Sequence, residues 1–179
     1  MNAIPFYYFA YGSNLPYLRM LDRTSNDVML KGKFAWAGYR LTFTKRSVDG
    51  SGKCTVTAST RDQVVWGAIY QLTLSDKKKL VKAEGGYHEQ SLLMPIDGVQ
   101  QAGFTFVADQ NQVDPSLSPY SWYKRLVLAG AREHGFPADY ITAIDRTAAL
   151  TDPNHARREK FEALLASIEG APKSRLASL

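Results

Sequence analysis

The chain has 179 residues, of which 45% are hydrophobic and 22% are charged, proportions that are ordinary for a soluble globular protein. The length favours one domain with a real hydrophobic core, and the composition excludes a disordered or fibrous chain. Its single cysteine excludes an intramolecular disulfide framework and a multi-cysteine zinc site. A net charge of +5 suits nucleic acid and a small anionic substrate equally. Because the basic residues form small separate groups and no long stripe, we expect no nucleic-acid partner.

The N-terminal residues 1–14 carry a short apolar run that Tyr and Gly interrupt early, with no basic segment before it. We therefore expect neither a signal peptide nor a membrane span there. No later stretch approaches the ~18 apolar residues of a transmembrane helix. The expected compartment is the cytoplasm, with no membrane partner.

Strand patterns dominate the first two thirds of the chain. Aromatic runs, β-branched residues or alternation at period two predict strands at residues 6–11, 28–45, 54–58, 64–72, 87–96 and 100–107. The first of them is continuously apolar, which predicts burial on both faces. Gly32 and Gly38 interrupt the second, which therefore forms one or two strands. Asp97-Gly98 predicts a tight hairpin, and residues 49–52 predict a mobile turn.

Helices are expected between and after these strands. Pro16 can begin a short helix, and Ser75 is the expected N-cap of a second helix that ends near Glu84, before Gly85-Gly86. A polar loop at 109–119 precedes an entirely helical remainder. It comprises helices at residues 119–134, 137–150 and 153–169, and a frayed tail at 173–179.

Strands first and helices last, without βαβ alternation, predict an α+β fold. We expect a small mixed, largely antiparallel β-barrel flanked by helices, with a C-terminal helical extension. Residues 1–150 should form the main domain. Residues 151–179 should add a helix and a tail to the same domain.

Familiar catalytic and cofactor motifs are missing from the sequence. His88, His134 and His155 are far apart and lack metal-site spacing, and Cys54 lies in an alternating strand pattern that favours a packing role. There is no G-x-S-x-G motif, phosphate-binding loop or dinucleotide-binding loop. We therefore expect no metal and no cofactor.

The segment Tyr11-Gly12-Ser13-Asn14-Leu15-Pro16 joins a buried strand to a helix. A glycine at this place lets the backbone approach a ligand closely, and the free N–H groups and dipole of a helix start favour a negative charge. The segment therefore forms either a carboxylate-binding loop or an ordinary β-turn with a Ser or Asn cap.

Glu84 shares a helix stripe with the apolar residues Leu80 and Val81. Partial burial and the negative end of the helix dipole both disfavour an ionised carboxylate, which suits a general base near neutrality. The alternative is a solvated helix end whose charge is compensated by neighbouring Lys residues. Tyr87 and Tyr123 offer flat apolar faces with a hydroxyl group, which suits a small polar substrate.

Four strings of the sequence, taken together, resemble the γ-glutamylcyclotransferase family. They are Tyr8-Phe9-Ala10-Tyr11-Gly12-Ser13-Asn14-Leu15, Trp66-Gly67-Ala68-Ile69-Tyr70, Ala83-Glu84-Gly85-Gly86-Tyr87 and Tyr123-x5-Ala129-Gly130-Ala131-x3-Gly135-x-Pro137. They occur in the family's order, cover residues 5–145, and leave the helix from Pro153 outside the resemblance.

The resemblance implies a pocket at one barrel mouth, with Glu84 as the catalytic acid/base. It implies that Tyr11, Gly12, Ser13 and Asn14 hold the γ-glutamyl part, and that Tyr8, Tyr87 and Tyr123 lie near the substrate. The implied reaction is cofactor-independent: the α-amine of a γ-glutamyl amide attacks its own side-chain carbonyl and releases 5-oxoproline plus an amine or amino acid.

Other functions fit the same sequence. A γ-glutamylamine cyclotransferase or another amide-cleaving enzyme would keep both the loop and Glu84, whereas a non-catalytic metabolite-binding member would normally have lost the acid. A basic RNA-binding domain fits least. The glutathione-degrading branch of the family usually lacks the residue found here at Asn14. The leaving group and the oligomeric state stay open.

Overall fold

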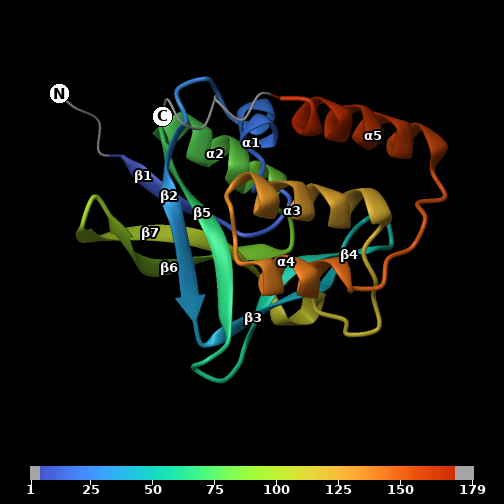
Figure 1. The fold of residues 1–179 in the computed structure, drawn as a ribbon, viewed down its shortest axis with the longest axis horizontal. Coiled ribbons are helices and arrows are strands. Elements are labelled where there is room, and N and C mark those ends of the chain that lie inside the picture. Colours follow the sequence, from blue (N-terminus) through green and yellow to red (C-terminus); the bar gives the residue numbers. More distant parts are fainter. Residues whose placement is uncertain (1–4, 172–179) are drawn as a thin grey trace.

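The computed structural model describes residues 5–171, so the frayed tail expected at 173–179 lies outside the described residues. Within this range, five strands form one sheet in the order β2-β5-β1-β7-β6, and two more form a separate sheet, β3-β4 (Figure 1). The strands are β1 (Phe6–Ala10), β2 (Met29–Ala37), β3 (Tyr39–Arg46), β4 (Gly52–Ala58), β5 (Val64–Leu72), β6 (Tyr87–Ile96) and β7 (Val99–Ala108). Strands β1 and β7 are parallel, and the other pairs are antiparallel.

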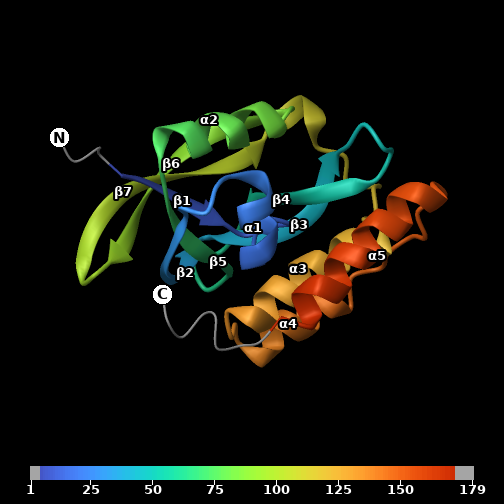
Figure 2. The same ribbon diagram turned by 90° about the horizontal axis from the view of Figure 1, so that it is seen from above.

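The helices flank these strands on two sides. Figure 2 shows α2 on one side of the strands and α3, α4 and α5 on the other. The helices are α1 (Tyr17–Arg23), α2 (Leu74–Ala83), α3 (Ser121–Glu133), α4 (Ala138–Asp145) and α5 (His155–Glu169), with a short 3₁₀ turn at Gln110–Gln112. None of the helices in the described residues is long and apolar enough to cross a membrane.

The expected α+β class is confirmed, but the expected β-barrel is not closed. Strands β2 and β6 are the outer strands of the five-stranded sheet in the described residues, and β3 and β4 pair with each other. A closed barrel requires every strand to have a hydrogen-bonded neighbour on both sides. Because β3 and β4 form their own sheet, they do not bridge the two outer strands.

Strand β1 occupies the centre of the five-stranded sheet, which explains its continuous apolar sequence. Tyr8, Phe9 and Ala10 are all buried, as expected for a strand covered on both faces. The strand ends directly at the segment that carries Gly12, so the sheet places this loop in the interior of the fold.

Local signals placed most elements correctly. The Asp97-Gly98 hairpin is present, with positive φ angles of +50° and +78°. The expected N-cap of α2 is wrong: Thr73, not Ser75, caps this helix. Thr73 accepts a hydrogen bond from the Asp76 N–H, and the Asp76 carboxylate accepts one from the Thr73 N–H, a reciprocal capping box.

Candidate active site

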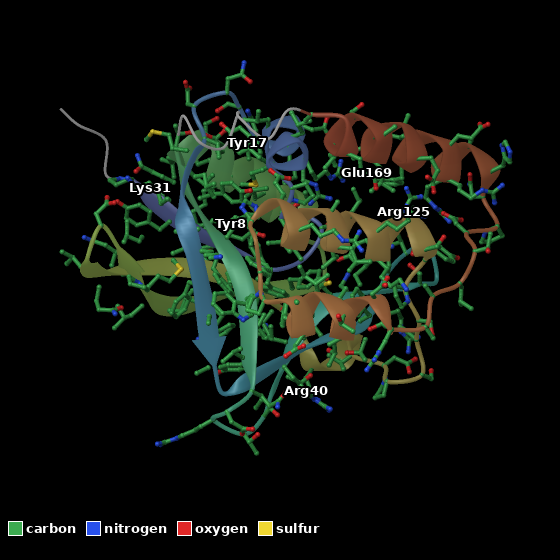
Figure 3. All side chains as sticks on the ribbon, in the orientation of Figure 1. Tyr8, Tyr17, Lys31, Arg40, Arg125 and Glu169 are labelled. Carbon is green, nitrogen blue, oxygen red and sulfur yellow. The ribbon has the colours of Figure 1, made fainter. Side chains whose placement is uncertain are left out.

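A cavity with about 300 Å³ of free space, part of it open to solvent, lies beyond the end of β1. All eight residues that the sequence singled out line it: Tyr8, Tyr11, Gly12, Ser13, Asn14, Glu84, Tyr87 and Tyr123. Cys54 of β4 and Phe106 of β7 complete the wall, and the pattern analysis had not selected them. In Figure 3, Tyr8 lies in the interior of the molecule, between the strands and α3.

The loop from Gly12 to Asn14 is both a turn and a cavity wall. The Leu15 N–H donates to the Gly12 carbonyl oxygen at 3.0 Å, as in a β-turn. Within the part of the chain that the structure describes, the N–H groups of Ser13 and Asn14 donate no hydrogen bond. They are therefore available to an anionic group of a ligand.

Two details of this loop differ from the sequence prediction. A Cβ at Gly12 would lie 3.0 Å from the Cys54 Cβ, so this glycine allows close packing on β4 as well as on a ligand. The start of α1 already holds a carboxylate, because the Tyr17 N–H donates to Glu133 Oε1 at 3.0 Å. The helix start is thus occupied by the protein's own anion, and Ser13 and Asn14 remain as the donors.

Asn14 is buried, with 4% of its surface exposed. Its Nδ2 donates to the Tyr8 hydroxyl at 3.1 Å and to Glu84 Oε1 at 3.3 Å. A carboxylate only accepts hydrogen bonds, so Nδ2 must face Glu84, and Oδ1 points elsewhere. In the described residues, Asn14 Oδ1 has no hydrogen-bond partner. A buried amide oxygen without a partner is costly, and a ligand donor would relieve it.

Glu84 is the C-cap of α2, and its side chain is 15% exposed. The expected partial burial is therefore confirmed. Its electrostatic surroundings differ from the prediction, because Arg23 Nη1 lies 2.9 Å from Glu84 Oε1. The compensating cation comes from α1 and not from the lysines of α2. The sequence offered only one indication of this ion pair, namely that Arg19 and Arg23 stand four residues apart on a predicted short helix.

The four cavity tyrosines form two pairs, which differ in whether the hydroxyl group donates its hydrogen to a main-chain carbonyl. Tyr11 donates to the Phe106 carbonyl, and Tyr87 donates to the Cys54 carbonyl at 2.8 Å. Tyr8 accepts from Asn14, and Tyr123 accepts from the Cys54 N–H at 3.0 Å. Tyr8 therefore keeps a hydrogen to donate to a ligand, and Tyr123, whose hydroxyl also contacts the weakly accepting Cys54 thiol, can turn its hydrogen to a ligand.

Burial controls the protonation of the groups around the cavity. It is the largest cause that raises the pKa of Tyr8, Tyr11, Tyr87 and Tyr123, so all four remain neutral donors near pH 7. Burial also raises the pKa of the Cys54 thiol to about 12. A thiol with this pKa is protonated near neutrality and is a poor nucleophile.

Lys45 of β3 also supports the turn that follows Glu84, and the sequence did not point to it. Its Nζ donates to the Gly85 carbonyl at 2.7 Å and stands 4.7 Å from the centre of the Tyr87 ring. Burial lowers the pKa of this amine. The register shift in the β3-β4 ladder between Thr42 and Lys45 brings the side chain to this position.

The three histidines lie in separate places. His88 contacts Asp109, and His155 contacts Glu159. His134 Nε2 lies 2.7 Å from the Leu15 carbonyl oxygen and supports the turn behind the cavity. No group of three His, Cys, Asp or Glu residues within 5–171 has the arrangement of a metal site.

The fold is that of the γ-glutamyl cyclotransferases. A solved structure named gamma-glutamyl cyclotransferase superposes with a TM-score of 0.79 at 22% identity, covering 92% of this chain and 99% of that chain. An uncharacterized protein from Homo sapiens superposes with a TM-score of 0.77 at 23% identity, covering 90% of this chain and 98% of that one.

The sequence comparisons agree with the fold. Residues 64–144 match the model of the AIG2-like family. The gamma-glutamylcyclotransferase of Bos taurus is 29% identical over 143 residues, which are 75% of this chain and 74% of the relative. The resemblance to the γ-glutamylcyclotransferase family that the four motifs indicated is confirmed, and it supports a γ-glutamylcyclotransferase-like function.

Proposed function

We propose that this protein is an enzyme that converts a γ-glutamyl amide into 5-oxoproline and a free amine or amino acid. The observation that carries the proposal is the pair formed by Asn14 and Glu84 in one cavity. Asn14 Oδ1 is buried without a partner in the described residues, and the Glu84 carboxylate lies beside the same amide. Two adjacent acceptors in one pocket suit a ligand that brings an ammonium group.

The chemistry follows from this placement. The α-ammonium of the substrate would donate to Asn14 Oδ1 and pass a proton to Glu84. The free amine would then attack the γ-carbonyl carbon and form the C–N bond of a five-membered lactam. The original amide C–N bond would break as the protonated Glu84 returns the proton to the departing nitrogen, and the ring nitrogen would pass its second proton through Glu84 to the released amine, which leaves as an ammonium. The attack is intramolecular, so holding the substrate in a folded geometry supplies much of the rate.

The remaining donors of the cavity suit the negative charges of such a substrate. The Ser13 and Asn14 N–H groups would bind the α-carboxylate or the oxyanion that develops on the γ-carbonyl oxygen. The hydroxyl hydrogens of Tyr8 and Tyr123 are available for the other oxygen atoms. Tyr11 and Tyr87 would contribute mainly their rings, because their hydroxyl groups already bind main-chain carbonyls.

The proposal is tested by product analysis on a panel of γ-glutamyl amino acids, γ-glutamylamines and glutathione. We expect 5-oxoproline and the free amine in equal amounts, measured by liquid chromatography and mass spectrometry. A matched panel with an N-acetylated α-amine should give no product, because that nitrogen is not nucleophilic. Release of glutamate would show that water attacks, and would contradict the cyclisation.

The same panel separates the alternative functions. We expect γ-glutamyl amino acids or small γ-glutamylamines to be better substrates than glutathione, because the loop with Asn14 resembles that branch of the family. Turnover of γ-glutamylamines alone would identify an amine-releasing cyclotransferase. Binding of 5-oxoproline in calorimetry without any turnover would identify a metabolite-binding protein, and would contradict the enzyme.

A further inference from the structure

We propose that Arg23 is a positioning residue that holds one oxygen of Glu84 so that the other oxygen faces the reacting nitrogen. This inference rests on the proposed function, because it assigns Glu84 the proton transfer. Arg23 is the last residue of α1, and it is 61 positions from Glu84 in the chain. It would act only through Glu84, since it does not line the cavity.

The two oxygens of the Glu84 carboxylate have different surroundings. Oε1 accepts from Arg23 Nη1 at 2.9 Å and from Asn14 Nδ2 at 3.3 Å. Within residues 5–171, Oε2 accepts no hydrogen bond. Two donors from different parts of the fold therefore hold one oxygen, which defines the direction of the other. Oε2 is the atom left to receive and return the proton.

The ion pair is also well sheltered from solvent. The side chain of Arg23 is 24% exposed and that of Glu84 is 15% exposed. Water screens such a pair less than it screens the exposed pair between Arg125 and Glu162, whose side chains are 41% and 43% exposed. The shielded contact can therefore control both the orientation and the charge of Glu84.

Other charged and titratable groups face Glu84 from the elements packed around it, but none replaces Arg23. They are Arg19 on α1, Lys45 on β3, Tyr8 on β1, Tyr87 on β6 and Tyr123 on α3. Burial keeps the tyrosines neutral, Arg19 binds Asp22, and Lys45 binds the Gly85 carbonyl. Among the cations of the described residues, Arg23 alone bonds to the Glu84 carboxylate.

The kinetic test compares Arg23→Met and Arg23→Lys with the wild type. For Arg23→Met we expect kcat to fall by ~10–100-fold, as for a misplaced catalytic group, while KM changes little. Arg23→Lys should restore part of kcat, since an ammonium keeps the charge but lacks the planar geometry of a guanidinium.

The matched control is Arg125→Met, which removes an Arg–Glu pair between α3 and α5, away from the cavity. It should leave kcat and KM unchanged. An Arg23→Met enzyme with wild-type kcat would overturn the proposal. If Arg23→Met does not fold, as judged by thermal denaturation, Arg23→Gln takes its place with the same expectations.

A second measurement separates this inference from the proposed function. The side-chain carboxyl carbon of Glu84 can be observed by NMR and assigned from its loss in Glu84→Gln. We expect its resonance at pH 7 to move in Arg23→Met, because the guanidinium beside Oε1 is gone, and to stay in place in Arg125→Met. An unmoved resonance in Arg23→Met would overturn the inference even if the wild type is active. Absence of turnover by the wild type would refute only the proposed function.

Discussion

Gly130 of α3 packs directly against Leu15, the residue that follows the cavity loop. A Cβ at Gly130 would lie 2.3 Å from the Leu15 Cβ and 2.8 Å from the Pro16 nitrogen. On the same turn, the Leu15 carbonyl oxygen accepts from the Tyr70 hydroxyl at 2.6 Å and lies near His134. The glycine of the Gly-Ala motif in α3 therefore allows the helix to support the loop from behind.

This contact predicts the effect of Gly130→Ala. The added methyl group must displace either α3 or the loop, since the nearest atoms are a Cβ and backbone atoms. We expect a loss of about 1–3 kcal/mol in the free energy of unfolding, as for an overpacked core, together with weaker binding of 5-oxoproline. Urea unfolding and calorimetry measure the two effects. The control is Gly85→Ala, where a Cβ meets nothing within 4 Å, and which should not lower stability. Wild-type stability in Gly130→Ala would contradict the packing argument.

Glu84→Gln tests the acid/base assignment. The amide keeps the size of the side chain but cannot accept and return a proton, so kcat should fall by ~10²–10⁴-fold. The measurement is the initial rate of 5-oxoproline formation with the best substrate of the panel. Glu89→Gln is the control, because Glu89 forms an ion pair with Lys77 outside the cavity. If Glu84→Gln retained activity while Glu89→Gln lost it, the assignment would pass to Glu89.

The two classes of cavity tyrosine predict different responses to removal of a hydroxyl group. Tyr123→Phe removes a donor that is available to the substrate, so kcat should fall by about 10²-fold, as for an oxyanion donor. Tyr87→Phe removes a hydrogen bond to the Cys54 carbonyl, which should cost ~1 kcal/mol of stability and affect kcat less. Steady-state kinetics and urea unfolding of both variants provide the comparison. Equal losses of kcat in the two variants would contradict this difference between Tyr123 and Tyr87.

Asp152 joins α5 to α3 and predicts a pH-dependent stability. Its buried carboxylate accepts from Arg157 Nε at 2.6 Å and from Trp122 Nε1 at 2.8 Å. These donors, Arg157 first, hold the pKa of Asp152 well below its usual range. A carboxyl whose pKa is lower in the folded state stabilises the fold above its unfolded pKa, and this contribution is lost as the pH falls through the folded value.

Asp152→Asn should therefore lower Tm at pH 7, by ~5 °C, because the Asn side chain cannot pair with the Arg157 guanidinium. The difference from the wild type should shrink as the pH falls below about 4, where aspartate protonates in the unfolded chain. Thermal denaturation at several pH values measures this. Asp27→Asn, at an exposed residue, should show no such trend. A Tm difference that stays constant down to pH 2 would contradict the electrostatic role.

Helix α5 lies outside the four sequence motifs, and its packing explains its place in the fold. Phe161 stacks on Trp122 with ring centroids 3.8 Å apart, and the Arg19 guanidinium lies 5.5 Å from the Phe161 ring. The helix thereby braces α3, which carries Tyr123, and α1, which carries Arg23. The sequence predicted this helix from the spacing of its apolar residues. Which residues those apolar side chains contact was decided by the packing of the helices.

The sequence by itself determined the features that depend on near neighbours. Apolar alternation identified the strands, and the motifs around Gly12, Glu84 and Tyr123 identified the eight cavity residues. The N-cap of α2 was missed locally, because Thr73 and Ser75 both suit a cap and only the reciprocal bonds with Asp76 distinguish them.

Only the tertiary structure decided the relationships between distant segments. These are the separate β3-β4 sheet that leaves the barrel open, the Arg23–Glu84 ion pair, the orphaned Asn14 oxygen and the division of the tyrosines. The periodicity of a helix or strand indicates which face each residue occupies, but a hydrogen bond requires two groups at about 3 Å in the right direction. That geometry is set when α1, α2, β4 and α3 pack around the end of β1, and no local pattern in the sequence carries it.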